Sequence, residues 1–137
     1  MNGYQKGKCF YCFKEVIVEG SNKDHMVDVD HFFPHMLKPM IQDVNFDGVW
    51  NLVLACPDCN RGIGGKFESI PNPYLLERLH TRNEYLINSH HPLRETLIRQ
   101  TGTTENIRIN FLKKMDKNAI GLLIHRWGPK EEHDTEF

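Results

Sequence analysis

The sequence predicts an α+β protein, with short strands and all four cysteines in its first half and helices in its second. Short β-branched or alternating stretches lie between turn-forming residues as far as about residue 66. From about residue 73, apolar residues recur with helical spacing instead. A chain of 137 residues suits one domain with a modest core. We therefore expect a single domain over residues 1–127, made of a cysteine-containing core (9–66) and a helical extension (73–127).

Three stretches of the first half have the pattern of strands. Residues 16–18 are β-branched throughout. Residues 26–30 alternate apolar and acidic side chains, so one face of that strand would carry both carboxylates and the other would be apolar. Residues 51–55 form a short, mostly apolar run that suits a buried strand. Residues 45–48, Asn-Phe-Asp-Gly, are typical of a turn before that last strand.

The second half predicts helices whose ends carry ordinary start and stop signals. Pro92 suits the first position of a helix over residues 92–100, and Gly102 would end it. Thr103 or Thr104 would cap a last helix, which Gly128-Pro129 would end. The acidic tail that follows, within residues 128–137, is expected to be disordered. Tyr74, Leu75, Leu79 and Leu86 could line one face of an earlier helix, and in the last helix the apolar residues with helical spacing are Ile107, Phe111, Leu112, Met115, Ala119 and Leu123.

Charge is unevenly distributed, although the net charge is only −1. Residues 1–59 carry 5 Lys and Arg against 8 Asp and Glu, a net of −3. Residues 60–127 carry 11 against 6, a net of +5, and residues 128–137 carry 1 against 4. The carboxylates of the first part could hold cations, and the basic second part could face an anionic polymer. A solvated helical surface would explain the same basic region.

The cysteines form two C-x₂-C pairs, Cys9 with Cys12 and Cys56 with Cys59. Four thiolates on two tight turns can complete a tetrahedron around Zn²⁺, and such a fully protein-bound zinc would be structural. Two disulfides or free buried thiols are the alternatives. The N-terminus has no apolar run typical of a secretory signal, which favours a cytoplasmic location and argues against disulfides. No stretch approaches the roughly 20 apolar residues that a membrane span needs.

Three polar features accompany the cysteines. Asp30-His31 ends the second predicted strand, Asn51 begins the third, and Asn60 directly follows Cys59. A carboxylate beside a histidine, with two later asparagines, is unfavourable in a hydrophobic core and suits one hard metal ion with an adjacent base. Asp28 would share a strand face with Asp30, and we expect it to be a solvated strand residue rather than an additional ligand.

Asp30-His31, Asn51 and the run Cys56-Pro-Asp-Cys59-Asn60 together resemble the HNH endonuclease motif in its H-N-N form. The cysteines are similar to the zinc-binding pairs that brace this motif in many members of the family. The resemblance covers residues 9–66, under half of the chain. It implies the ββα-metal fold, in which two antiparallel strands and a helix surround a single divalent ion.

The resemblance also implies a role for each motif residue. His31 would be the general base that activates the attacking water, and Asp30 and Asn60 would bind the catalytic ion. Asn51 would orient the base or its loop through a hydrogen bond to His31, which would fix the imidazole tautomer. Plainer roles stay open: a satisfied loop or core histidine for His31, a helix cap for Asn60, and backbone satisfaction at a strand end for Asn51.

The chain departs from the family pattern in two places. Many members have a basic residue shortly after the last asparagine, whereas Arg61-Gly-Ile-Gly-Gly-Lys66 follows it here. The glycines would let the backbone approach a phosphate, which Arg61 or Lys66 could bind, although a loop that ends a helix explains this run too. The last motif residue is asparagine rather than histidine, an oxygen ligand that favours Mg²⁺ or Mn²⁺ over softer metals.

The sequence thus predicts a metal-dependent endonuclease that cleaves DNA, most consistent with a double-stranded substrate and a role in host defence or restriction. The alternative is a zinc-stabilised nucleic-acid-binding module without cleavage, against which Asp30, His31 and Asn60 argue. A zinc-stabilised protein-interaction domain is a third reading, which the basic second part disfavours. Because the first cysteine lies so near the start, one further hypothesis is that the chain is a C-terminal module of a longer protein, with other domains or subunits as partners.

Overall fold

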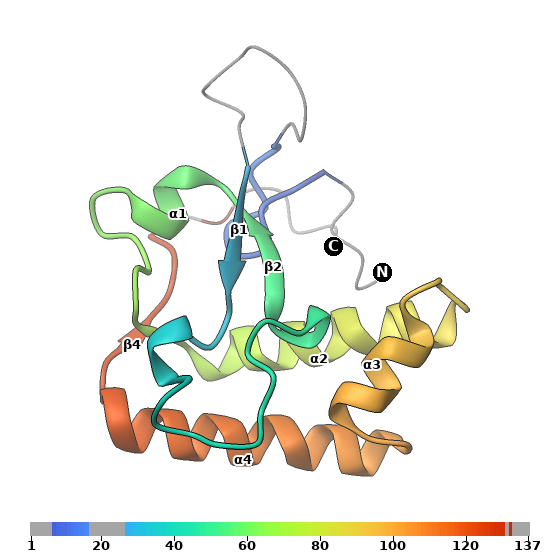
Figure 1. The fold of residues 1–137 in the computed structure, drawn as a ribbon. Coiled ribbons are helices and arrows are strands. Elements are labelled where there is room, and N and C mark those ends of the chain that lie inside the picture. The colour runs from blue at the N-terminus through green and yellow to red at the C-terminus, as the bar shows by residue number, and fades with distance from the viewer. Residues whose placement is uncertain (1–6, 17–26, 131, 133–137) are drawn as a thin grey trace.

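The computed structural model describes residues 7–16, 27–130 and 132. Figure 1 shows a small strand-containing core with the longer helices gathered beneath it. The expected α+β class is confirmed, because strands in the first half are followed by helices in the second. None of the helices within these described residues is long and apolar enough to cross a membrane.

The core contains an antiparallel strand pair followed directly by a short helix. Strand β1 (Asp28–His31) pairs with β2 (Leu52–Ala55), and the register sets His31 opposite Leu52. Helix α1 (Pro57–Arg61) begins two residues after β2, with proline at its first position, where the missing N–H costs no hydrogen bond. α1 packs against β1, so the last cysteine pair and Asn60 lie beside the strand that carries Asp30 and His31.

The alternation expected around Asp30 is present, but the acidic face is the buried one. Asp30 is 8% exposed, whereas Val29 on the opposite face is 62% exposed. The physical reason is that polar partners cover the acidic face: Tyr11 and Lys66 contact Asp30, and Asn60 contacts Asp28. The period-two pattern therefore predicts which residues share a face but not which face is buried.

The first cysteine pair lies in a tight turn. The amide of Cys9 donates to the carbonyl of Lys14 at 2.7 Å, and Lys8 and Glu15 form an isolated antiparallel bridge around it. Val16 is buried next to this turn. The rest of the strand expected over residues 16–18 lies outside the described residues.

A long connection, residues 32–51, joins β1 to β2 and contains two short 3-10 helices, η2 (His35–Leu37) and η3 (Val49–Asn51). The turn expected at residues 45–48 is confirmed, because the amide of Gly48 donates to the carbonyl of Asn45 at 3.1 Å. Asn51 belongs to η3 rather than to the following strand.

The helical extension consists of α2 (Pro73–Asn88), α3 (Arg94–Thr101) and α4 (Glu105–Leu123). Gly102 ends α3 with φ of +142°, a conformation that side chains rarely adopt, and this confirms it as the stop. Thr104 rather than Thr103 caps α4, because its hydroxyl accepts the N–H of Ile107 at 3.3 Å.

The end expected for the last helix, Gly128-Pro129, is wrong. α4 ends at Leu123, where Ile124 takes a left-handed conformation, and Arg126–Trp127 forms β4. β4 pairs in parallel with β3 (Ile70–Pro71). Arg126 fixes this return of the chain, because its guanidinium donates to both carboxylate oxygens of Asp116 and to the carbonyl of Pro71.

α2 ties the helical extension to the core through two arginines. Arg82 is buried and donates to the carbonyls of Leu52 at 2.9 Å and Val49 at 3.1 Å, at the start of β2. Arg78 donates to the carbonyls of Phe10 and Tyr11, both at 2.9 Å, inside the first cysteine turn. These bonds supply donors to backbone carbonyls at the start of β2 and in the first cysteine turn.

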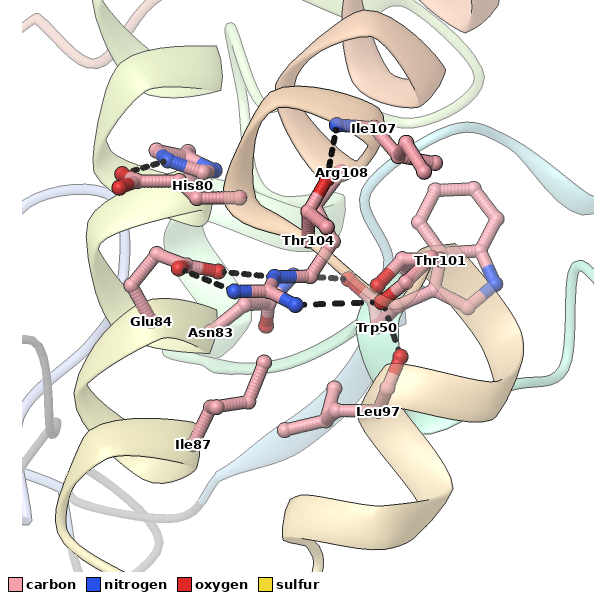
Figure 2. Close-up of polar contacts among 12 residues, drawn as sticks. Trp50, His80, Asn83, Glu84, Ile87, Leu97, Thr101, Thr104, Ile107 and Arg108 are labelled. Atoms are coloured by element: carbon pink, nitrogen blue, oxygen red, sulfur yellow. Dashed lines mark hydrogen bonds and ion pairs between the residues drawn. The ribbon is translucent and has the colours of Figure 1, made fainter.

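A buried ion pair joins α2 to α4. Figure 2 shows the guanidinium of Arg108 facing the carboxylate of Glu84, with hydrogen bonds of 2.7 and 2.8 Å. Arg108 also donates to the carbonyl of Gly102 at 3.1 Å, so the same side chain closes the turn between α3 and α4. Four aromatic residues near the cysteines are fully buried in the core: Phe10, Tyr11, Phe32 and Phe33.

Candidate metal centre and catalytic site

The cysteine pairs meet in one buried cluster. The four sulfur atoms all lie within 4.8 Å of one another, and no disulfide joins them. The Sγ atoms of Cys12 and Cys56 are 3.7 Å apart. Tetrahedral Zn–S bonds of about 2.3 Å place neighbouring sulfurs about 3.8 Å apart, so the cluster fits a structural metal ion of this kind. The structure does not contain the disulfide alternative, since all four cysteines are free and the separation of Cys12 and Cys56 is well beyond an S–S bond of about 2.05 Å.

The environment of the cluster suits a cation. Hydrogen bonds with Cys12 raise the pKa of Cys59 and lower that of Cys56. The backbone N–H of Tyr11 points at the Sγ of Cys9 at 3.3 Å, a contact that stabilises a thiolate. Cys12, Cys56 and Cys59 also line an open pocket of about 340 Å³. The cysteines are therefore compatible with a bound metal that their own thiolates hold.

His31 lies at the end of β1, half-exposed and held by a carboxylate that the sequence did not suggest. Its Nε2 lies 2.8 Å from the Oδ1 of Asp47. The imidazole of His35 packs edge-on against it, with ring centroids 5.3 Å apart. Asn51 does not make the hydrogen bond to His31 that the resemblance implies; its side chain bonds the backbone of Phe33 and Phe46.

Asn51 is fully buried and holds backbone instead of the imidazole. Its Oδ1 accepts the N–H of Phe33 at 2.7 Å, and its Nδ2 donates to the carbonyls of Phe33 and Phe46, both at 3.0 Å. One side chain thus fixes the segment that follows His31 and the turn that carries Asp47. The reason is geometric: Asn51 lies in η3, at the end of the long connection, and the buried carbonyls of that connection need donors.

Asn60 is inside α1 and not at its cap, since the helix begins at Pro57. Its Nδ2 donates to the Oδ2 of Asp28 at 3.0 Å, and the Nε of Arg61 reaches the same oxygen at 2.8 Å. Partial burial raises the pKa of Asp28, but hydrogen bonds from Arg61 and Asn60 together outweigh it and hold the pKa below its ordinary value. Asp28, expected to be solvated, is therefore an ionised part of the site.

Asp30 makes its hydrogen bond and its ion pair with buried side chains of the core. Its Oδ2 accepts the hydroxyl of Tyr11 at 2.6 Å and lies 3.3 Å from the Nζ of Lys66. The same Nζ donates to the carbonyl of His31 at 2.9 Å. Burial lowers the pKa of Lys66, and the charge of Asp30 opposes that change. The structure thus brings Asn60 to Asp28 and joins Asp30 to Tyr11 and Lys66.

From the sequence, Lys66 was a candidate for binding a phosphate, but its side chain is not positioned to do so. Lys66 is fully buried, because the chain after α1 turns back toward β1. Its ammonium contacts Asp30 and the carbonyl of His31 at the end of β1. Arg61 has a side chain that is 62% exposed, so its guanidinium is accessible beyond its contact with Asp28. Of the two basic residues, only Arg61 remains a candidate for contact with a substrate.

Two contributors to the site were missed from the sequence. Asp47 lies in a segment that looks like an ordinary turn, and nothing in the pattern relates it to a histidine 16 residues earlier. Tyr11 stands between two cysteines, where an aromatic residue is expected simply to pack. One signal could have revealed Tyr11: Asp30 is an acidic residue on the inner face of a strand, and a buried carboxylate requires a donor nearby.

A second group of potential metal ligands lies between α2 and α4. His80, Glu84 and Glu105 place ligand atoms within 4.8 Å of one another, and Nε2 of His80 lies 3.1 Å from Glu105. His80 is partly buried on α2. Figure 2 shows that Glu84 faces Arg108, which occupies both of its oxygens. This competition with an arginine argues against a metal site there.

Comparisons with protein-family models, with curated proteins and with solved structures found no match to this chain. Its function is therefore inferred from its residues and their geometry.

Proposed function

We propose that the protein is a metal-dependent endonuclease of the HNH type, which hydrolyses phosphodiester bonds of DNA. The observation that carries this proposal is the adjacency of the elements that bear the motif residues. His31 ends β1, Asn51 directly precedes β2, and Asn60 lies in the helix that follows β2. β1 pairs with β2 and packs against α1, and α1 carries Cys59 of the four-cysteine cluster next to Asn60.

His31 is the proposed general base. Its side chain is 28% exposed, so water and a substrate phosphate can reach it, and its contact with Asp47 restrains it. Imidazole accepts protons effectively near neutral pH. In the proposed reaction the water oxygen bonds to phosphorus while His31 takes the water's proton, and the bond from phosphorus to the leaving sugar oxygen breaks.

The proposed ion-binding residues are Asp30 and Asn60, with Asp28 as the partner that orients Asn60. Asp28 accepts the amide N–H of Asn60, which leaves the amide oxygen of Asn60 to act as a ligand. Asp30 is on the same face of β1, two residues away. A divalent ion such as Mg²⁺ or Mn²⁺, when bound there, would neutralise charge on the phosphate and the leaving oxygen.

The cysteine cluster is proposed to bind a structural Zn²⁺. All four ligand positions would be filled by thiolates, so the zinc would have no open position for water or phosphate. Its role would be to hold the first cysteine turn against α1, which carries Asn60 next to Cys59. The zinc would then position the catalytic residues without taking part in the chemistry.

DNA is the proposed substrate because the second part of the chain is basic. Residues 60–127 have a net charge of +5, and Lys113, Lys114 and Lys117 are exposed on α4. Such charges favour a phosphate backbone, through contacts that carry no sequence information. The preference for double-stranded DNA and the role in host defence or restriction rest on the resemblance to the HNH motif.

The test is nicking of supercoiled plasmid DNA with Mg²⁺ or Mn²⁺, with and without EDTA. We expect His31→Ala to lower the cleavage rate by about 10²–10⁴-fold, the usual effect of losing a general base. His35→Ala is the matched control, because it removes a neighbouring, more exposed imidazole and should leave most activity. Cleavage by His31→Ala at the rate of the unsubstituted protein would disprove the assignment.

A second candidate function, a zinc-stabilised nucleic-acid-binding module without cleavage, is favoured by one observation. Lys66 lies against Asp30 and supplies a positive charge where the proposed ion would bind. Asp30→Ala distinguishes the two functions in the same assay. A nuclease should need more Mg²⁺ or lose activity while keeping its zinc, whereas a binding module should show only salt-sensitive DNA binding and no cleavage in any variant.

A further inference from the structure

The carboxylate of Asp47 contacts three side chains, those of His31, His35 and Lys38. Its Oδ1 lies 2.8 Å from Nε2 of His31 and 3.9 Å from Nε2 of His35. Its Oδ2 accepts from the Nζ of Lys38 at 3.2 Å. Hydrogen bonds from His31 and Lys38 lower the pKa of Asp47, so the carboxylate is ionised at neutral pH.

The backbone around Asp47 is fixed from several sides, although its side chain is 51% exposed. The amide of Asp47 donates to the Oδ1 of Asn45 at 3.1 Å, and the indole N–H of Trp50 donates to the carbonyl of Asn45 at 2.8 Å. Phe46, directly before Asp47, is fully buried, and its carbonyl accepts from Asn51. The anchored backbone fixes the position from which the exposed carboxylate of Asp47 reaches His31.

We propose that Asp47 is a positioning residue that fixes both the orientation and the tautomer of His31. Resting on the proposed nuclease function, the inference assigns the proton of His31 to Nε2, facing Asp47, and leaves Nδ1 to accept the proton of the attacking water. A neutral imidazole has one donor and one acceptor nitrogen, and the partner of the first decides the role of the second. Lys38 holds the second oxygen of Asp47 and so keeps its carboxylate turned toward His31.

This arrangement also explains the position of Asn51. Its side chain bonds the backbone of Phe33, two residues after His31, and that of Phe46, directly before Asp47. Asn51 therefore sets the distance between the imidazole and the carboxylate without touching either side chain.

The experiment compares Asp47→Ala with Asp47→Asn in the full chain. Asparagine keeps an oxygen that can accept the Nε2–H of His31, whereas alanine removes it. We expect Asp47→Ala to lower kcat by about 10- to 100-fold with little change in KM, as partners of functional histidines typically do. Asp47→Asn should recover most of that loss. Asp43→Asn, an exposed carboxylate of the same connection, is the matched control and should leave kcat unchanged.

Nitrogen NMR of labelled histidine gives a second measurement that does not depend on cleavage. In the unsubstituted protein and in Asp47→Asn, His31 should carry its proton on Nε2, and in Asp47→Ala both tautomers should be populated. An unchanged tautomer together with full activity in Asp47→Ala would overturn the inference while the nuclease function stands. If the unsubstituted protein cleaves no DNA, the proposed function fails, and the tautomer measurement still decides whether Asp47 fixes His31.

Discussion

Lys66 is a buried cation that contacts one carboxylate and two backbone carbonyls. Its ammonium lies 3.3 Å from the carboxylate of Asp30 and donates to the carbonyl of His31. It therefore joins the segment after α1 to the strand that carries the proposed base. Removing one partner from a buried ion pair leaves the other charge desolvated and uncompensated, which is costly.

We predict that Lys66→Ala lowers the free energy of unfolding by about 3–5 kcal/mol, because Asp30 would lose its buried cation. Urea denaturation measures this change. Arg61→Ala is the matched control, since it also removes a basic residue of the same segment but an exposed one, and it should change stability little. Equal stability of the two variants would show that the Lys66 ion pair contributes nothing.

The contact between Asp28 and Asn60 has a comparable role at the surface of the site. It turns the amide of Asn60 so that its nitrogen faces Asp28. A carboxylate that fixes an asparagine in this way acts through its neighbour, which is why we assign Asp28 to positioning and Asp30 to the proposed ion.

At the scale of elements, β1 is unusual because it buries its acidic face and exposes Val29. Tyr11, Lys66 and Asn60 make this possible, since each supplies a donor to a carboxylate that a strand would otherwise leave unpaired. The strand, the first cysteine turn and α1 therefore depend on one another through polar contacts as well as packing.

α4 provides a test of an element boundary. We predict that Thr104→Ala lowers the free energy of unfolding by about 1 kcal/mol, because the hydroxyl that accepts the N–H of Ile107 would be lost. Thermal or urea denaturation measures the change. Thr103→Ala is the matched control at the neighbouring exposed position and should have a much smaller effect. A larger loss in Thr103→Ala would mean that the cap is assigned to the wrong residue.

At the scale of the whole molecule, two sets of contacts hold the cysteine cluster and the helical extension together. Arg78 on α2 donates to two carbonyls of the first cysteine turn, and Arg82 donates to carbonyls at the start of β2. The extension is thus bonded to both parts of the core that supply cysteines or proposed catalytic residues. Loss of the cluster should therefore affect the entire chain.

We predict that Cys59→Ser abolishes cooperative folding, because structural zinc in a small domain contributes a large part of the folding free energy. Elemental analysis of the unsubstituted protein should find near one zinc per chain, and circular dichroism should follow the loss of structure in the variant. A folded, active preparation that contains no zinc would contradict this. EDTA applied briefly should stop cleavage and leave that zinc bound.

Several features could be predicted from the sequence because they depend on residues close together along the chain. The C-x₂-C spacing indicated that the cysteines belong together. Apolar spacing indicated α2 and α4, and the signals at Pro92 and Gly102 located α3 to within two residues. The caps at Gly102 and Thr104 follow from local backbone chemistry. The end of α4 did not, because Arg126 pairs with Asp116 and Pro71, which are distant in sequence.

The sequence by itself determined the motif residues of the candidate site: a histidine beside a carboxylate, two asparagines and four cysteines at a characteristic spacing. Only the tertiary structure decided how these groups meet. It set Asp47 against His31, turned Asn60 toward Asp28, and buried Lys66 beside Asp30. The physical reason is that each of these contacts joins residues more than a dozen positions apart. Periodicity gives the face on which a side chain lies, but the packing of other elements decides what that face meets.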